Sequence, residues 1–234
     1  EQLLRLPRNF SCYAPPAESP EVAALPALTT GCVTFGSFNN LCKLTPEVVA
    51  LWARVLQTVP GSRLLLKSKA LADAATAADF LAQFAAHGIA AARLSLVGEV
   101  AGFTGHLAAY AQVDIALDPF PFTGATTSCE ALWMGVPVIT LAGSSHVARV
   151  GVSLLTSVGM EALIADDEAQ YVAIAAQLAG DLTTLAALRQ GLRGRMAASP
   201  LCDALGYTRE LEAAYRRMWH CWCHRSGSPE AGPV

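Results

Sequence analysis

The chain has 234 residues, of which 53% are hydrophobic and 15% charged, and its formal net charge is −3. This length and composition allow a large buried core and exclude an intrinsically disordered chain. The small negative charge gives no electrostatic basis for binding nucleic acid or an anionic membrane, and no uninterrupted apolar run is as long as a membrane span.

The seven cysteines are scattered, and none forms a Cys-x-x-Cys pair. An odd number of dispersed cysteines favours reduced thiols in a cytoplasmic protein over a disulfide framework. The first ten residues lack the basic start and apolar stretch of a signal peptide, and also an initiator methionine. We therefore expect a chain cut from a longer protein.

Residues 1–31 are rich in proline and show no helical or strand periodicity. This pattern predicts an extended linker that enters a folded domain near Gly31. The domain is expected to cover residues 32–223, and the Ser/Gly/Pro-rich residues 224–234 are expected to form a flexible tail.

From Cys32 onward, short apolar runs alternate with segments that repeat at helical spacing. The predicted strands are Cys32–Phe38, Arg63–Lys67, Leu94–Val97, Ile115–Leu117, Val138–Leu141 and Leu163–Ala165. The predicted helices are Pro46–Val59, Ala74–Ala86, Phe103–Ala111, Glu130–Met134, Val147–Ser157, Glu168–Ala179, Leu182–Ala198 and Tyr207–Trp222. This alternation, with continuously apolar strands, is typical of an α/β fold with a doubly wound parallel sheet.

Ligands bind such sheets beyond the carboxyl ends of the strands. Small, polar and basic residues are concentrated at those ends, in residues 37–43, 67–69, 98–99, 118–127 and 142–149. The sequence therefore predicts that the functional residues lie in the loops along one rim of the sheet.

The loop from Asp118 to Thr127 lies between a strand and a helix and contains Gly124 and several threonines. A helix that begins in Gly, Thr and Ser residues presents unpaired N–H groups and the positive end of its dipole, which is where phosphate binds in α/β proteins. We therefore expect a nucleotide diphosphate site here. The alternative is an ordinary connection in which Thr127 or Ser128 caps the helix, because the loop matches neither glycine-rich phosphate fingerprint.

Three side chains on the rim are candidates for nucleotide contacts. Lys43 can reach a diphosphate and offset the charge that grows as the phosphate leaves, or it is a solvated surface lysine; Lys67 and Lys69 share this ambiguity with weaker placement. Glu130 can accept hydrogen bonds from a ribose diol, or it only favours the helix dipole. His106 can stack on a base, or it is an ordinary surface or core histidine.

No catalytic triad and no pair of carboxylates for glycoside hydrolysis is defensible from spacing, and no general base is evident. His220, Cys221, Cys223 and His224 are residue types that bind zinc, but their spacing fits neither paired knuckles nor a helical metal pair. We expect buried thiols at a helix end there, and no metal.

Three ordered segments resemble one family. They read FGSFNNLCKLTPEVVALWARVLQTVPGSRLLLKS, HLAAYAQVDIALDPFPFTGATTSCEALWMGVPVITL and SHVARVGVSLL. They are similar to the C-terminal catalytic half of O-GlcNAc transferases, above all the bacterial SPINDLY-like proteins with tetratricopeptide (TPR) repeats. The similarity extends from about Arg5 to Cys223.

This resemblance implies a Rossmann-like domain that is the C-terminal, donor-binding half of a GT-B glycosyltransferase, with residues 1–31 entering from a missing N-terminal half. It implies inverting, metal-independent transfer of GlcNAc from UDP-GlcNAc to protein Ser or Thr hydroxyls, without a cofactor. The missing half and the TPR repeats would bind the acceptor and supply the general base. The chain alone would bind nucleotide and turn over little or nothing.

The resemblance also implies roles for particular residues. Asn40 and Lys43 would contact the donor diphosphate, with Lys43 as the catalytic group that supports departure of UDP. His106 would lie against the uridine, and Glu130 would hold the ribose. The residues that would hold the diphosphate at the helix N-terminus are Gly124, Ala125, Thr126 and Thr127.

The chain departs from the animal enzymes of this family at several of these positions. Those enzymes have Gln, His and Asp at the positions of Asn40, Ala125 and Glu130, and a basic residue at that of Ala109. Alternative functions are therefore the same fold with GDP-fucose or UDP-glucose as donor, for O- or N-linked transfer, or a non-catalytic nucleotide-binding scaffold.

Overall fold

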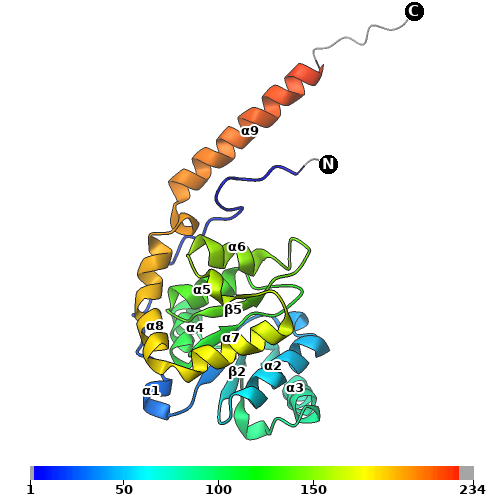
Figure 1. Ribbon diagram of the computed structural model, residues 1–234, viewed down its shortest axis with the longest axis vertical. Coiled ribbons are helices and arrows are strands. Elements are labelled where there is room, and N and C mark those ends of the chain that lie inside the picture. Colours follow the sequence, from blue (N-terminus) through cyan, green and yellow to red (C-terminus); the bar gives the residue numbers. More distant parts are fainter. Residues whose placement is uncertain (1–2, 227–234) are drawn as a thin grey trace, which may run out of the picture.

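The computed structural model describes residues 3–226. Its centre is a parallel six-stranded sheet in the order β3-β2-β1-β4-β5-β6, with helices on both faces (Figure 1). The strands are β1 (Thr34–Ser37), β2 (Arg63–Lys67), β3 (Leu94–Val97), β4 (Ile115–Leu117), β5 (Val138–Leu141) and β6 (Ile164–Ala165). The predicted α/β doubly wound sheet is confirmed, and its order reverses between β1 and β4, where such folds bind ligands.

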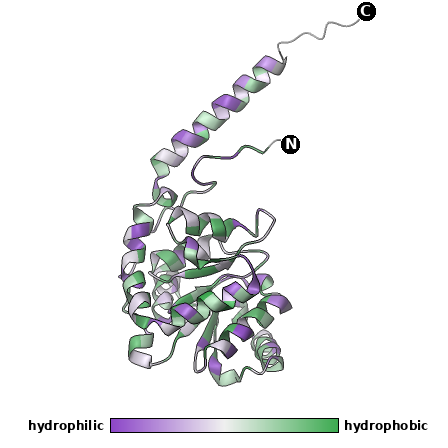
Figure 2. Cartoon of the chain, viewed as in Figure 1, coloured by the Kyte–Doolittle hydropathy of each residue, from purple (hydrophilic) through white to green (hydrophobic). Residues whose placement is uncertain are grey.

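Side chains of the strands alternate between two apolar layers, as the period of two in a strand requires. In β2, Leu64 and Leu66 belong to one core cluster and Leu65 to the other. The first cluster lies under α2, α3 and α7, and the second under α5, α6 and most of α8. Strand β4, which reads Ile-Ala-Leu, is buried along its whole length. The region of the sheet is largely coloured as hydrophobic in Figure 2.

The helices follow the predicted alternation closely. They are α1 (Ala27–Thr30), α2 (Pro46–Thr58), α3 (Ala74–Ala86), α4 (Gly102–Ala108), α5 (Thr126–Trp133), α6 (Val150–Ser157), α7 (Glu168–Gly180), α8 (Leu182–Ala197) and α9 (Ala204–Ser226). Short 3-10 helices include η1 (Leu41–Lys43) and η4 (Ala109–Gln112). The Thr45 hydroxyl caps α2 by accepting from the Val48 N–H.

Three helix starts differ from the prediction by three or four residues, and that of α9 lies at Ala204 instead of Tyr207. Helix α5 begins at Thr126, four residues before Glu130, so Thr127 and Ser128 lie in its first turn and neither caps it. Hydroxyl residues are weak helix formers, and tertiary contacts described below hold this turn. Helix α6 begins at Val150 because the Val147 carbonyl accepts hydrogen bonds from the backbone and side chain of Thr123.

Residues 3–26 contain no helix or strand. They contact the domain through Asn9, whose side-chain amide donates to the Ser157 hydroxyl, and through Tyr13, whose N–H donates to the Leu201 carbonyl. Asp114 anchors the following segment, because its carboxylate accepts from the N–H groups of Ala27 and Thr34. Buried Arg189 donates to the carbonyls of Ala23 and Val113. Part of the predicted linker, residues 1–31, thus already packs against the domain before Gly31, the predicted domain boundary.

Helix α9 projects away from the domain (Figure 1). Near the start of α9, Arg8 of the predicted linker forms ion pairs with Asp203 and Glu210. The segment from His220 to His224, with its two cysteines, lies on this helix. Cys221 and Cys223 are exposed, so the expectation of buried thiols is wrong. Within residues 3–226, no three His, Cys, Asp or Glu side chains group as metal ligands. Most of the predicted flexible tail, residues 227–234, lies outside the described residues.

Across the described part of the chain, no single helix has both the length and the hydropathy of a membrane span. Only α7 and α8 taken together pass by length and composition, and they are bent by 96° at their junction.

Candidate functional site

Asp118, directly after β4, is the buried centre of the loop that leads into α5. Its carboxylate accepts from the Gly124 N–H at 2.7 Å, the Ser128 hydroxyl at 3.3 Å and the Thr140 hydroxyl at 2.8 Å. These bonds join the loop, the first turn of α5 and strand β5. Asp118 therefore fixes the position at which α5 begins.

Burial raises the pKa of Asp118 from its ordinary value of 3.8 to about 6, against the opposing effect of its hydrogen bonds and of Lys43. Because the folded-state pKa is the higher one, ionisation of this group disfavours the folded state. Its contribution to stability is full below about pH 4 and is lost as the pH rises through about 6.

Asp118→Asn is expected to remove this pH dependence while keeping the shape of the side chain. Relative to the variant, the wild type should lose on the order of 3 kcal/mol of unfolding free energy between about pH 3 and pH 7. Urea unfolding of both proteins across this range measures the difference between their unfolding free energies. In this difference, the contributions of groups that titrate alike in both proteins cancel. Parallel pH profiles would contradict the assignment.

The N-terminus of α5 is open to an anion. Ala125 occupies the cap position, and no side chain caps the helix. Ala125 and Thr126 are exposed, and the N–H groups of the first turn have no carbonyl within the helix to bond. The positive end of the helix dipole adds to the attraction for a phosphate.

Gly124 is held so closely that no side chain fits. A Cβ atom there would lie 2.7 Å from Asp118 Oδ1 and would collide with the Ser128 hydroxyl. The Gly124 N–H is already donated to Asp118. Gly124 therefore shapes the turn into α5, and its own N–H group is not free for an anion.

Lys43 crosses from the loop after β1 to the loop after β4. Its Nζ donates to the Thr123 carbonyl at 2.9 Å and lies 4.2 Å from the centre of the Phe122 ring. Burial lowers the pKa of Lys43, and the charge of Asp118 opposes this shift. The structure thus brings Lys43 to the α5 loop, as the position of its own loop on the rim predicts.

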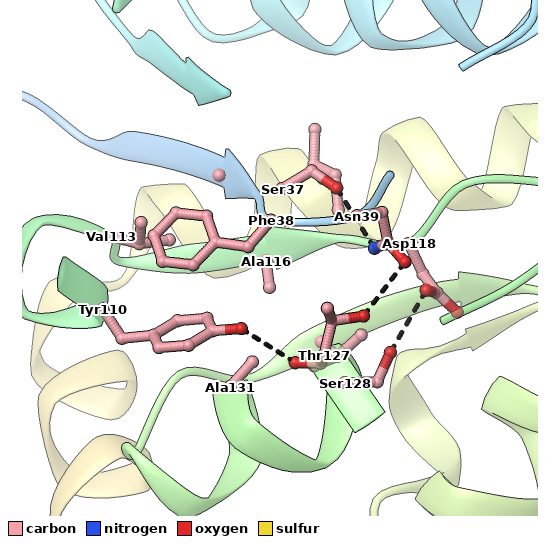
Figure 3. Close-up of a pocket in the computed structure, with 13 residues that line it drawn as sticks. Ser37, Phe38, Asn39, Tyr110, Val113, Ala116, Asp118, Thr127, Ser128 and Ala131 are labelled. Atoms are coloured by element: carbon pink, nitrogen blue, oxygen red, sulfur yellow. Dashed lines mark hydrogen bonds between the residues drawn. The ribbon is translucent and has the colours of Figure 1, made fainter. Parts of the chain in front are cut away.

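The two adjacent asparagines differ in burial and in their partners. Asn40 is exposed, and its side-chain oxygen accepts from the Cys42 N–H as the cap of η1, while its contact with a donor diphosphate stays a prediction. Asn39 is buried and accepts from the Thr127 hydroxyl at 3.0 Å, and its amide donates to Ser37 (Figure 3). In the sequence, the only indication that Asn39 turns inward is the alternation of side chains along a strand, which places Asn39 on the same side of the chain as Ser37.

His106, on α4, joins two buried charged groups. Its Nε2 lies 2.9 Å from Oε2 of Glu130, and its Nδ1 lies 2.6 Å from Nζ of Lys67. Glu130 is only 5% exposed. The predicted base and ribose residues are therefore adjacent, and Lys67, which had only weak placement in the sequence, is part of the same chain of contacts.

Aromatic rings surround His106. The Phe103 ring is stacked on it at 5.9 Å between centroids, and Phe38 and Tyr110 present their edges. The Tyr110 hydroxyl donates to the Thr127 carbonyl at 3.0 Å (Figure 3). Tyr110 thereby couples the histidine side of the rim to the first turn of α5.

A cavity of about 10 Å³ lies beneath this rim, between β1, β4 and α5 (Figure 3). Such a volume holds about one water molecule. The cavity is therefore too small to hold a nucleotide.

Comparison with known proteins identifies relatives over nearly the whole chain. The model of glycosyl transferase family 41 matches residues 23–211. A SPINDLY protein of Oryza sativa subsp. japonica, described as a probable UDP-N-acetylglucosamine–peptide N-acetylglucosaminyltransferase, is 48% identical over 95% of this chain. The SEC protein of Arabidopsis thaliana, with the same description, is 33% identical over 81% of it.

Among solved structures, a mutant O-GlcNAc transferase of Thermobaculum terrenum is 39% identical, with a TM-score of 0.89 over 97% of this chain. Anabaena HepE in complex with UDP and glucose is 14% identical with a TM-score of 0.57, and shares the fold. The chain spans 24% of the rice protein and 43% of the Thermobaculum chain.

Proposed function

Because the chain belongs to glycosyl transferase family 41, we propose that it is the donor-binding half of an inverting, metal-independent protein O-GlcNAc transferase. The donor would be UDP-GlcNAc, and the acceptors would be Ser or Thr hydroxyls of proteins. The observation that carries the proposal is the uncapped N-terminus of α5 beside Lys43, at the switch point of a GT-B sheet.

The diphosphate would bind to the first-turn N–H groups of α5, from Ala125 to Thr127. Lys43 would exchange the neutral Thr123 carbonyl, which it contacts in this structure, for a charged phosphate oxygen. Hydrogen bonds between two charged groups are shorter and stronger than those to a neutral acceptor. Lys43 would bind most strongly when the bond from the sugar to UDP breaks and negative charge builds on the leaving phosphate.

The nucleoside would lie along the His106 side of the rim. Its base would pack against the imidazole and the exposed Phe103 ring. Its ribose would reach the Glu130 carboxylate, of which Oε2 is already bonded to His106. This arrangement would place the anomeric carbon of the sugar beyond Lys43, at the open side of the rim.

The general base and the acceptor groove are proposed to lie outside this chain. Transfer requires that the acceptor hydroxyl lose its proton as its oxygen bonds to the anomeric carbon, while the bond to UDP breaks. Near the α5 loop, the carboxylate of Asp118 is buried, and Glu130 is bonded to His106. A preceding catalytic half and TPR repeats in a bacterial, cytoplasmic protein would supply the missing groups.

Calorimetric titration with UDP, UDP-GlcNAc, UDP-glucose and GDP-fucose tests the donor. We expect one site that binds UDP and binds UDP-GlcNAc more tightly than the other sugars. Preference for GDP-fucose or UDP-glucose would assign the alternative donors. Binding combined with absence of transfer by the full-length protein would favour a scaffold, and absence of binding to every nucleotide would overturn the proposal.

Glu130→Gln tests the ribose contact. Loss of a charge-assisted hydrogen bond should lower the affinity for UDP by about tenfold. If the carboxylate holds the ribose diol, the variant should also discriminate less between UDP and its 2′-deoxy and 3′-deoxy analogues. Glu161→Gln, at an exposed residue, is the control. Equal discrimination by wild type and variant would exclude the ribose role.

A further inference from the structure

Lys67, the last residue of β2, makes a contact that determines where the hydrogen of a neutral His106 lies. Two nitrogen atoms 2.6 Å apart need one hydrogen and one lone pair between them. An ammonium group has only hydrogens to offer, so His106 Nδ1 has to accept. A neutral ring then carries its hydrogen on Nε2, 2.9 Å from the Glu130 carboxylate, to which it donates.

We propose that Lys67 is a positioning residue for the nucleotide donor. It holds His106 in the Nε2–H tautomer and, through the ring, keeps the Glu130 carboxylate in place for the ribose. This inference rests on the proposed function, since it assigns an indirect role to a residue that supports the base and ribose contacts.

The contacts from Lys67 through His106 to Glu130 matter because the two charged residues are buried. Lys67 is 9% exposed and Glu130 5% exposed, so both charges need partners inside the protein. The His106 ring connects them, and the Phe38 ring lies 5.1 Å from the ammonium group. Burial lowers the pKa of Lys67, and the charge of Glu130 opposes that shift. Without Lys67, the Glu130 charge has no cation at the other end of the ring.

The tautomer also decides which atoms face the donor. With hydrogen on Nδ1 instead, Nε2 would present a lone pair to the Glu130 carboxylate, and the two would repel. Either the ring or the carboxylate would then turn away from its position on the rim. Lys67 excludes that arrangement without having to touch the nucleotide.

Lys69 provides a matched control two residues away. It is 83% exposed and pairs only loosely with Glu99, at 3.7 Å. Lys67→Met and Lys69→Met therefore make the same chemical change, inside and outside the chain of contacts. Lys67→Arg is the conservative variant, because a guanidinium group is also only a donor.

The experiment is ¹⁵N NMR of the imidazole nitrogens in the ligand-free protein, with the signals of His106 assigned by His106→Gln. We expect the Nε2–H tautomer in the wild type, in Lys69→Met and in Lys67→Arg. In Lys67→Met only the Glu130 contact still favours Nε2–H, and we expect a mixture that includes rings turned away from Glu130 with hydrogen on Nδ1. Calorimetry with UDP should then show about a tenfold loss of affinity in Lys67→Met alone.

A wild-type ring with hydrogen on Nδ1, or an unchanged tautomer in folded Lys67→Met, would overturn the inference. So would a changed tautomer with unchanged UDP affinity. If Lys67→Met does not fold, loss of the tautomer in folded Lys67→Arg would contradict it equally. Failure of the wild type to bind UDP would instead refute the proposed function, because the tautomer is measured without ligand.

Discussion

Lys43→Met is expected to weaken UDP binding by about a hundredfold and to abolish detectable sugar transfer by the full-length protein. The ammonium group lies at the α5 loop, 2.9 Å from the Thr123 carbonyl, and is proposed to turn to the diphosphate. Methionine keeps the length and apolar stem of the side chain but removes the charge. Calorimetry with UDP and a peptide glycosylation assay measure the two effects.

The loss should not reflect unfolding. Lys43 is only half-buried, and burial already disfavours its charge, so the variant should keep its unfolding free energy within about 1 kcal/mol. Lys69→Met, at an exposed residue, should bind UDP like the wild type. If Lys43→Met bound UDP with unchanged affinity, Lys43 would be a surface lysine without a role in donor binding.

Gly124→Ala should have the second largest effect. The added methyl group would push against the Asp118 carboxylate and the Ser128 hydroxyl, both of which are buried. We expect a loss of about 1–3 kcal/mol in unfolding free energy. Displacement of the α5 N-terminus by about 1 Å should also lower transfer by about a hundredfold.

Gly191→Ala is the matched control. Gly191 is an exposed residue of helix α8, and a Cβ there meets no atom within 4 Å. The same exchange should therefore stabilise the protein by about 0.5–1 kcal/mol and leave UDP binding unchanged. A Gly124→Ala protein with wild-type stability and UDP affinity would show that the loop does not need its close approach to Asp118.

The sheet was predictable because its strands are short, continuously apolar runs between helical repeats. Many buried residues contribute to this pattern, so the predicted strands do not depend on the correct assignment of any single side chain. The start of α5 was not predictable in the same way. Thr126 to Ser128 are weak helix formers, and a carboxylate eight residues upstream, Asp118, holds their turn.

The rim was predictable from strand ends, but individual contacts on it were not. The structure brings Lys43, His106, Thr127 and Glu130 to one rim, as their places after successive strands indicate. Their donor contacts remain predictions. Which of two adjacent asparagines turns inward, or which lysine reaches a histidine 39 residues away, depends on side-chain directions that a single sequence does not encode.

Donor binding at the α5 N-terminus is tested most directly by an amide-resolved NMR titration of this chain with UDP. We expect saturable shifts at Lys43, at the amides from Gly124 to Thr127, and at His106 and Glu130. Shifts confined to the opposite cavity of about 210 Å³, between Gly31 and Leu182, or no shifts at all, would contradict it.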